Sequence, residues 1–132
     1  MHLFGRSWSL ARLFGKPQTL GARGERLAAK TLKAAGCRIL ARNYRCPAGE
    51  ADLVALKGDM LIFAEVKTRT SDFFTDPESA VDRRKQEKYR RVAQYYLSHI
   101  QRDDLSTRFD IVAIVIPPGE KPQVRHLADA FH

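Results

Sequence analysis

Apolar side chains recur every three or four residues in two segments of the chain, which predicts two amphipathic helices. The first spans residues 20–35 and is followed by Gly36, a typical helix stop. The second ends near residue 99 or 100, and a cluster at residues 75–78 (Thr-Asp-Pro-Glu) predicts its start. That cluster combines a capping side chain, a proline for the first turn and an early acid.

Between and after these helices lie short runs of β-branched and other apolar residues, which predict strands. They cover residues 37–44, 51–56, 60–66 and 109–116, and residues 123–127 are a candidate for one more short strand. The order is therefore helix, three strands, helix, strand, with or without the last strand. This αβββαβ order predicts the α/β class.

Length and composition indicate one domain, which we place at residues 20–132, after a basic tail at residues 1–19. The chain has 132 residues, of which 44% are hydrophobic, enough for a core without cross-links. The two cysteines, Cys37 and Cys46, show no metal-ligand spacing, and we expect them to be reduced in a cytoplasmic protein. The longest apolar run has only six residues, at 111–116, so we expect no transmembrane helix.

The positive charge is concentrated at one end of the sequence. The formal net charge is +8, and residues 1–50 carry 10 basic and 2 acidic residues, whereas the remainder carries 13 of each. A surplus of one sign in one region indicates a polyanionic partner, either nucleic acid or an anionic membrane surface. The alternatives are a solvated basic face and, for the tail alone, a membrane or partner anchor or an organelle transit peptide.

The segment 51–66 gives the best hairpin signal in the chain, and its register brings two acids together. With a two-residue turn at Gly58 and Asp59, paired positions sum to 117, so that Asp52 lies opposite Glu65. Like charges directly across a ladder are destabilising unless a cation lies between them. A three-residue turn would instead place Asp52 on the other face of the hairpin.

In the two-residue register Glu50 also lies opposite Lys67, on the same face as the two acids. Carboxylates without neighbouring His or Cys favour Mg²⁺ or Mn²⁺ over zinc. The Glu65-x-Lys67 relation holds for any turn, because the two residues are two apart on one strand. Taken alone, this pair is equally typical of a solvent-facing ion pair.

Several motifs in this order resemble a known family. They are Gly21-x-x-Gly24-Glu25, Arg42-Asn43-Tyr44-Arg45, Gly49-Glu50-x-Asp52, Glu65-Val66-Lys67-Thr68-Arg69 and Arg108-Phe109-Asp110. The acidic and Glu-x-Lys motifs resemble the core of the PD-(D/E)xK, restriction-endonuclease-like superfamily of nucleases. The whole run, residues 21–116, looks like the YraN-like family of small bacterial proteins. The sequence departs from the superfamily motif at Ala51, where a proline would stand.

The resemblance implies a mixed β-sheet flanked by helices, similar to archaeal Holliday junction resolvases. It also implies Asp52 and Glu65 as ligands of Mg²⁺ or Mn²⁺ and Lys67 beside the attacking water. Glu25 would complete the metal site, although an acid early in a helix is also favoured by the helix dipole. Gln86 matches a functional glutamine of some related nucleases, although an exposed helical glutamine is commonly just solvated.

The function that follows is a metal-dependent endonuclease acting on branched or otherwise non-duplex DNA. Symmetric cutting of a junction would require a homodimer, for which the sequence shows no interface signature. The alternative is a nucleic-acid-binding protein without turnover. In either case the basic side chains expected to meet phosphates are Arg42, Arg45, Arg69, Arg83, Arg84, Lys85, Lys88, Arg90 and Arg91. Asp110 begins the last predicted long strand, where we expect it to cap a turn or pair with an arginine.

Overall fold

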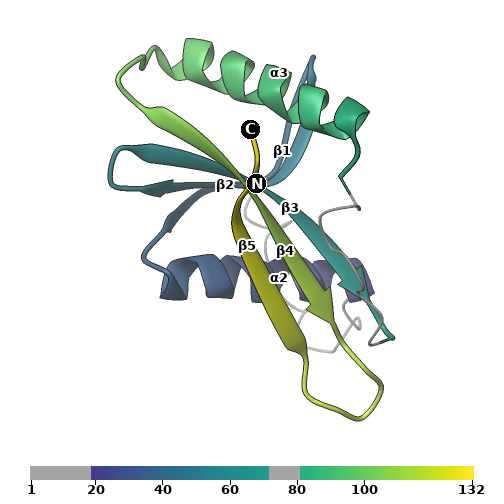
Figure 1. The fold of residues 1–132 in the computed structure, drawn as a ribbon. Coiled ribbons are helices and arrows are strands. Elements are labelled where there is room, and N and C mark those ends of the chain that lie inside the picture. Colours follow the sequence, from purple (N-terminus) through teal and green to yellow (C-terminus); the bar gives the residue numbers. More distant parts are fainter. Residues whose placement is uncertain (1–18, 72–80) are drawn as a thin grey trace, which may run out of the picture.

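The computed structural model describes residues 19–71 and 81–132. Its elements follow the predicted order, and the last strand is present (Figure 1). They are α2 (Leu20–Ala34), β1 (Arg38–Cys46), β2 (Gly49–Lys57), β3 (Met60–Arg69), α3 (Arg83–Ile100), β4 (Ser106–Val115) and β5 (Gln123–Phe131). The predicted basic tail lies outside the described residues, apart from Thr19, whose hydroxyl accepts a hydrogen bond from the Ala22 amide and caps α2.

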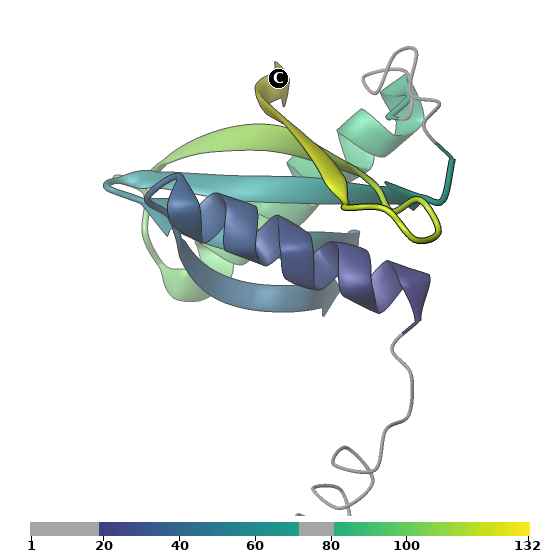
Figure 2. The same ribbon diagram turned by 90° about the horizontal axis from the view of Figure 1, so that it is seen from below.

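The five strands form one sheet in the order β1-β2-β3-β4-β5. Strands β3 and β4 are parallel, and the other neighbours are antiparallel, so the sheet is mixed as the resemblance implied. The chain leaves β3, passes through α3 and returns in β4, because parallel neighbours need such a crossover. The two helices cover opposite faces of the sheet, as the two perpendicular views show (Figures 1 and 2). The molecule therefore has three layers with a core on each side of the sheet.

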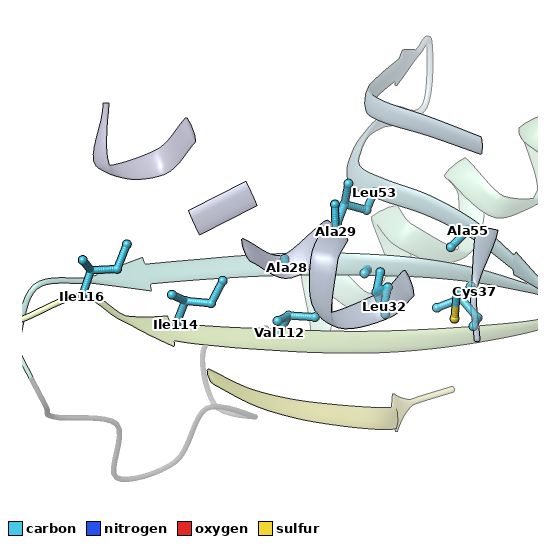
Figure 3. Packing of buried hydrophobic residues seen from close by; sticks show 11 residues of the cluster. Ala28, Ala29, Leu32, Cys37, Leu53, Ala55, Val112, Ile114 and Ile116 are labelled. Carbon is cyan, nitrogen blue, oxygen red and sulfur yellow. The ribbon is translucent and has the colours of Figure 1, made fainter. Parts of the chain in front are cut away.

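One core lies under α2, where small side chains let the helix approach the strands. Ala28, Ala29 and Leu32 are buried against a floor that includes Val112 and Ile114 of β4 (Figure 3). The helix ends where the sequence predicted: Ala35 is its C-cap, and Gly36 follows with φ 93°. A positive φ of this kind is accessible to glycine at little cost.

The other core lies under α3 and is built from aromatic side chains. Tyr89 of the helix packs edge-on against Phe109 of β4 and Phe131 of β5. The helix begins later than predicted, at Arg83, because the side chain of Asp82 accepts a hydrogen bond from the Lys85 amide and caps it. The expected cap at residues 75–78 lies outside the described residues, and Val81 is a buried non-helical residue.

The β2–β3 hairpin has the predicted register. Its pairs run from Lys57↔Met60 to Leu53↔Ala64, so paired positions sum to 117 around a two-residue turn. Gly58 in this turn has φ 61°, which suits a tight hairpin. The three-residue alternative is thereby excluded.

Asp110 holds the two C-terminal strands together from inside. It is fully buried in β4, and Arg108 of the same strand makes two hydrogen bonds of 2.9 Å to its carboxylate. His126 Nε2 lies 2.7 Å from the same group, and the Asp129 amide of β5 donates to it at 3.0 Å. These donors outweigh the effect of burial and keep the pKa of Asp110 below its ordinary value. The expected pairing of Asp110 with an arginine is confirmed.

Candidate active site

The β2–β3 ladder ends at Leu53↔Ala64, one pair before the two acids would face each other. Beyond this point β2 remains paired with β1 as far as Gly49, while β3 remains paired with β4 as far as Arg69. The two strands of the hairpin therefore separate. Asp52 lies at the point of separation, where its Oδ2 accepts the Val66 amide hydrogen at 2.7 Å. A side chain thus replaces a main-chain partner, and the sheet opens between β2 and β3.

Glu65 is the buried member of the acidic pair, with 5% of its surface exposed. Its Oε1 accepts a hydrogen bond of 2.7 Å from the Tyr89 hydroxyl of α3. Its Oε2 lies 2.5 Å from Lys85 Nζ, also of α3, and 3.5 Å from Lys67 Nζ. A carboxylate this deeply buried requires such partners, because an unpaired charge away from water is costly.

A cleft of about 590 Å³ opens over these groups and is bordered by both acids and by basic side chains. Lys85 and Lys88 of α3 line it together with Arg45 of β1. Gly49 contributes here, because its φ of 144° suits glycine and a Cβ would lie 3.1 Å from Lys88 Cγ. The stem of Lys88 crosses this glycine at close range, which positions the lysine at the cleft.

The pKa values of the two acids are shifted in opposite directions, and Glu65 is buried whereas Asp52 is partly buried. Burial raises the pKa of Asp52 to about 7, and the charges of Glu65 and Glu25 add to this effect, against the hydrogen bond from the Val66 amide. Burial also acts to raise the pKa of Glu65, but the hydrogen bonds from Lys85 and Tyr89 outweigh it and lower that pKa. Glu65 is therefore charge-compensated within the protein, whereas Asp52 is not. The position of Asp52 favours an additional positive charge.

Three other predicted residues lie around this centre. Glu25 of α2 accepts a hydrogen bond of 3.1 Å from the side-chain amide of Asn43. It is not in the first turn of α2, so the helix-dipole interpretation does not apply. Glu50 is not paired with Lys67 as expected: the ladder ends before this pair, and Glu50 forms an ion pair of 3.1 Å with Arg45. Gln86 donates to the Val81 carbonyl at 3.1 Å, at the beginning of α3.

The basic residues of α3 do not share one face. Lys85 and Lys88 border the cleft, whereas Arg90 donates to the main-chain carbonyl of His132 and Arg91 pairs with Glu87 at 3.8 Å. Arg83 and Arg84 are exposed in the first turn, and Arg69 ends β3. Arg42 of β1 borders a separate surface groove beside the end of α2. The structure thus brings only part of the predicted phosphate-binding set to the acidic pair.

Sequence reasoning missed two partners of Glu65. Lys85 was predicted to meet phosphates, but neither this lysine nor Tyr89 was connected to the acid. A signal was present: Lys85 stands four residues before Tyr89 and seven before Val92, both buried. Residues four apart share a helix face, so this lysine stands within an apolar stripe. A charged side chain in such a stripe usually has a buried partner.

Two carboxylates, Asp52 and Glu65, are the groups at this site that could hold a divalent cation. Within residues 19–71 and 81–132, no three His, Cys, Asp or Glu side chains come together as a metal-binding group, and Glu25 as a third ligand stays a prediction. One or two carboxylates nevertheless suit Mg²⁺, whose other ligands are commonly water and substrate phosphate. The uncompensated charge of Asp52 also fits a cation. The donor set is therefore compatible with Mg²⁺ or Mn²⁺.

The fold and the site define an α/β protein in which a mixed sheet opens beside a pair of acids under a basic cleft. The sequence match agrees with the predicted family: residues 24–114 match the family described as "Uncharacterised protein family UPF0102". The chain belongs to this family, and the YraN-like assignment is confirmed at that level.

Several bacterial relatives match this chain over most of their length. The chain is 46% identical over 112 residues to a UPF0102 protein of Rhodococcus opacus, covering 85% of this chain and 95% of the relative. It is 43% identical over 122 residues to one of Nocardia farcinica, covering 92% and 95%. For one of Moorella thermoacetica the identity is 46% over 101 residues, covering 76% and 84%.

Two further expectations concern the chain as a whole. Both cysteines are free thiols, as predicted. In the part of the chain that the structure describes, no helix has the length and apolar character needed to span a membrane.

Proposed function

We propose that this chain is a metal-dependent nuclease of the PD-(D/E)xK type, which hydrolyses phosphodiester bonds of branched or otherwise non-duplex DNA. The observation that carries the proposal is the meeting of Asp52 and Glu65 where β2 and β3 separate, with Lys67 beside Glu65. The two acids border a cleft with basic walls. These residues also match the superfamily motif. The preference for non-duplex DNA is taken from the likeness to junction resolvases.

The acids and the basic residues of the site would have separate roles in phosphodiester hydrolysis. Asp52 and Glu65 would hold Mg²⁺ or Mn²⁺, which supplies the Lewis acidity that polarises a phosphoryl oxygen and acidifies water. Lys67, whose Nζ lies 3.5 Å from Glu65, places a fixed positive charge beside the two acids. This charge stabilises the negative charge that develops on the phosphate and orients the attacking water. Lys88 and Arg45 attract the DNA backbone to the cleft.

The test is cleavage of a labelled panel containing duplex, single-stranded, flap and four-way-junction DNA, with Mg²⁺ or Mn²⁺. We expect Glu65→Gln to lower cleavage at least about a hundredfold, the upper end of what loss of an outer-shell partner costs at a metal site. Glu87→Gln, which removes an exposed acid of α3 that pairs with Arg91, is the matched control and should cut normally. Equal cleavage by wild type and Glu65→Gln would contradict the proposal.

A nucleic-acid-binding role without turnover is the second candidate, and one observation favours it. Lys85 and Lys67 already neutralise Glu65, so the buried acid needs no metal ion for charge balance. This role predicts salt-sensitive DNA binding that ignores Mg²⁺ and survives Asp52→Ala. The cleavage panel separates the two: binding without cutting on every substrate supports the second candidate.

A further inference from the structure

Both oxygens of the Glu65 carboxylate are occupied by groups from α3. The Tyr89 hydroxyl donates to Oε1 at 2.7 Å, and Lys85 Nζ lies 2.5 Å from Oε2. Lys67 is the third partner, at the longer distance of 3.5 Å from the same Oε2. The shortest ionic contact of the proposed metal ligand Glu65 is therefore made by a residue outside the Glu-x-Lys motif.

This contact conflicts with metal binding at the same acid. A metal ion needs an oxygen lone pair of Glu65, and a divalent cation is strongly repelled by an ammonium group a few ångströms away. Tyr89 is uncharged, so it does not repel a metal ion. Its side chain is also 1% exposed, so the surrounding core holds it in place. Lys85 is the opposite case, because its side chain is 39% exposed and carries its charge on a flexible four-carbon stem.

The cleft provides a second place where the Lys85 ammonium group could contact an anion. Its side chain borders the same cavity as Lys88 and Arg45, which is where a phosphodiester backbone would lie. An ammonium group that leaves Glu65 can therefore exchange one anion for another without leaving the site. Lys67 differs from Lys85, because it belongs to β3 and its Nζ lies farther from Oε2, at 3.5 Å.

We propose that Lys85 is a displaceable internal cation, which competes with the divalent metal for Glu65 and transfers to a phosphate of the nucleic acid when the metal binds. The inference rests on the proposed function, since it requires a metal at Asp52 and Glu65. In this arrangement the metal ion displaces Lys85 toward the phosphate, and the phosphate draws Lys85 away from the metal ligand Glu65. Metal and nucleic acid therefore bind with positive coupling, and the coupling is reciprocal.

The test measures Mn²⁺ binding directly, by electron paramagnetic resonance of the free ion, in the full chain without DNA. We expect Lys85→Met to bind Mn²⁺ about tenfold more tightly than wild type, a change equivalent to about 1.4 kcal/mol. Lys88→Met is the matched control, because it removes the same charge from the same cleft one turn away. It should change the affinity less than about threefold, since its charge is not placed on Glu65.

A second measurement tests the coupling. Fluorescence anisotropy of a labelled single-stranded DNA, with and without Mn²⁺, should show a Mn²⁺-dependent gain in affinity for wild type and Lys88→Met. In Lys85→Met this gain should be lost, because the transferable ammonium group is absent. If circular dichroism shows that Lys85→Met does not fold, Lys85→Gln replaces it, since glutamine keeps a hydrogen-bond donor for Glu65 without the charge.

The outcomes separate this inference from the proposed function. Equal Mn²⁺ affinity in Lys85→Met and Lys88→Met, with binding abolished by Asp52→Asn, overturns the competition and leaves the metal site standing. Absence of Mn²⁺ binding in wild type and Lys85→Met, or binding unaffected by Asp52→Asn, overturns the metal site and the inference with it. Tighter binding confined to Lys85→Met, with loss of the coupling, supports both.

Discussion

At the scale of single residues, two acids that neighbouring strands bring together have opposite electrostatic states. Glu65 is the more deeply buried by exposed surface, yet its pKa is lowered, because Lys85 and Tyr89 donate to it. The pKa of Asp52 is raised to about 7, because burial and the charges of Glu65 and Glu25 prevail over one amide hydrogen bond. The hydrogen-bond donors and charges around each acid, rather than its depth of burial, therefore determine its charge state.

The charge of Asp52 should make the stability of the protein depend on pH, and Asp52→Asn removes this charge. A raised pKa means that the folded chain holds the proton more tightly than the unfolded chain, whose aspartate titrates near 3.8. Ionisation of Asp52 therefore lowers the wild-type free energy of unfolding. This loss grows as the pH rises from 3.8 to about 7 and is constant at higher pH. Asparagine does not ionise and can still accept the Val66 amide. We expect Asp52→Asn to be more stable than wild type at pH 8 by on the order of 2 kcal/mol.

Urea unfolding of both chains at pH 4 and pH 8 checks this expectation. The comparison cancels the titration of groups that do not interact with Asp52, so the difference between the two chains reports on Asp52 and its coupling to Glu65. A stability difference that is the same at both pH values would show that the carboxyl is not perturbed. Greater stability of the variant at high pH would identify Asp52 as a residue whose charge is retained for function at a cost in stability.

At the scale of elements, the contact between α2 and β3 depends on one glycine. A Cβ added at Gly24 would lie 1.9 Å from Thr68 Oγ1 and 2.8 Å from Thr68 Cβ. Thr68 is β-branched and stiff, so it cannot rotate away at low cost. Gly21, one turn earlier, has no atom within 4 Å of such a Cβ. Only the second glycine of the Gly21-x-x-Gly24-Glu25 motif is therefore required by packing.

These two glycines give a matched pair of substitutions. We expect Gly24→Ala to lower the free energy of unfolding by about 1–3 kcal/mol, because overpacking outweighs the gain in helix propensity. Gly21→Ala should raise it by up to about 1 kcal/mol, because alanine favours the helix and meets no neighbour. Urea unfolding of both variants measures the two effects. Equal changes in the two would contradict the close approach of α2 to β3.

At the scale of the whole molecule, the cleft selects which basic residues can act on a bound polyanion. Lys88 borders the cleft beside the acids, whereas Arg91, three residues later, does not border it and pairs with Glu87. Both belong to the same helix and carry the same charge. Net charge alone therefore predicts equal contributions, and the fold predicts unequal ones.

Charge reversal at these two positions tests the location of the nucleic-acid surface. We expect Lys88→Glu to weaken binding of labelled four-way-junction DNA about tenfold in about 0.1 M salt, where charges beyond about 10 Å are screened. Arg91→Glu should weaken it less than about threefold, although the net charge changes equally. Fluorescence anisotropy over a salt series checks both values. Equal losses would indicate a diffuse electrostatic attraction without a defined cleft.

Local patterns in the sequence determined much of this molecule. Helical and alternating periodicity identified the elements and their order, because such patterns report which side of an element faces a core. The residue count of the turn at Gly58 and Asp59 fixed the hairpin register, and with it the predicted proximity of Asp52 and Glu65. The start of α3 was placed wrongly, because residues 75–78 and Asp82 offer competing caps and the sequence does not rank them.

The tertiary structure decided what surrounds the two acids. The end of the ladder at Leu53↔Ala64 depends on β2 following β1 while β3 follows β4, which is a property of the whole sheet. The contacts of Lys85 and Tyr89 with Glu65 join residues 20 and 24 positions apart and depend on how α3 docks on the sheet. Periodicity fixes the face on which a residue lies, but distances between elements are set by packing of the complete core. For this reason the sequence determined that Asp52 and Glu65 come close together, and only the fold determined the partners and the charge states of the two acids.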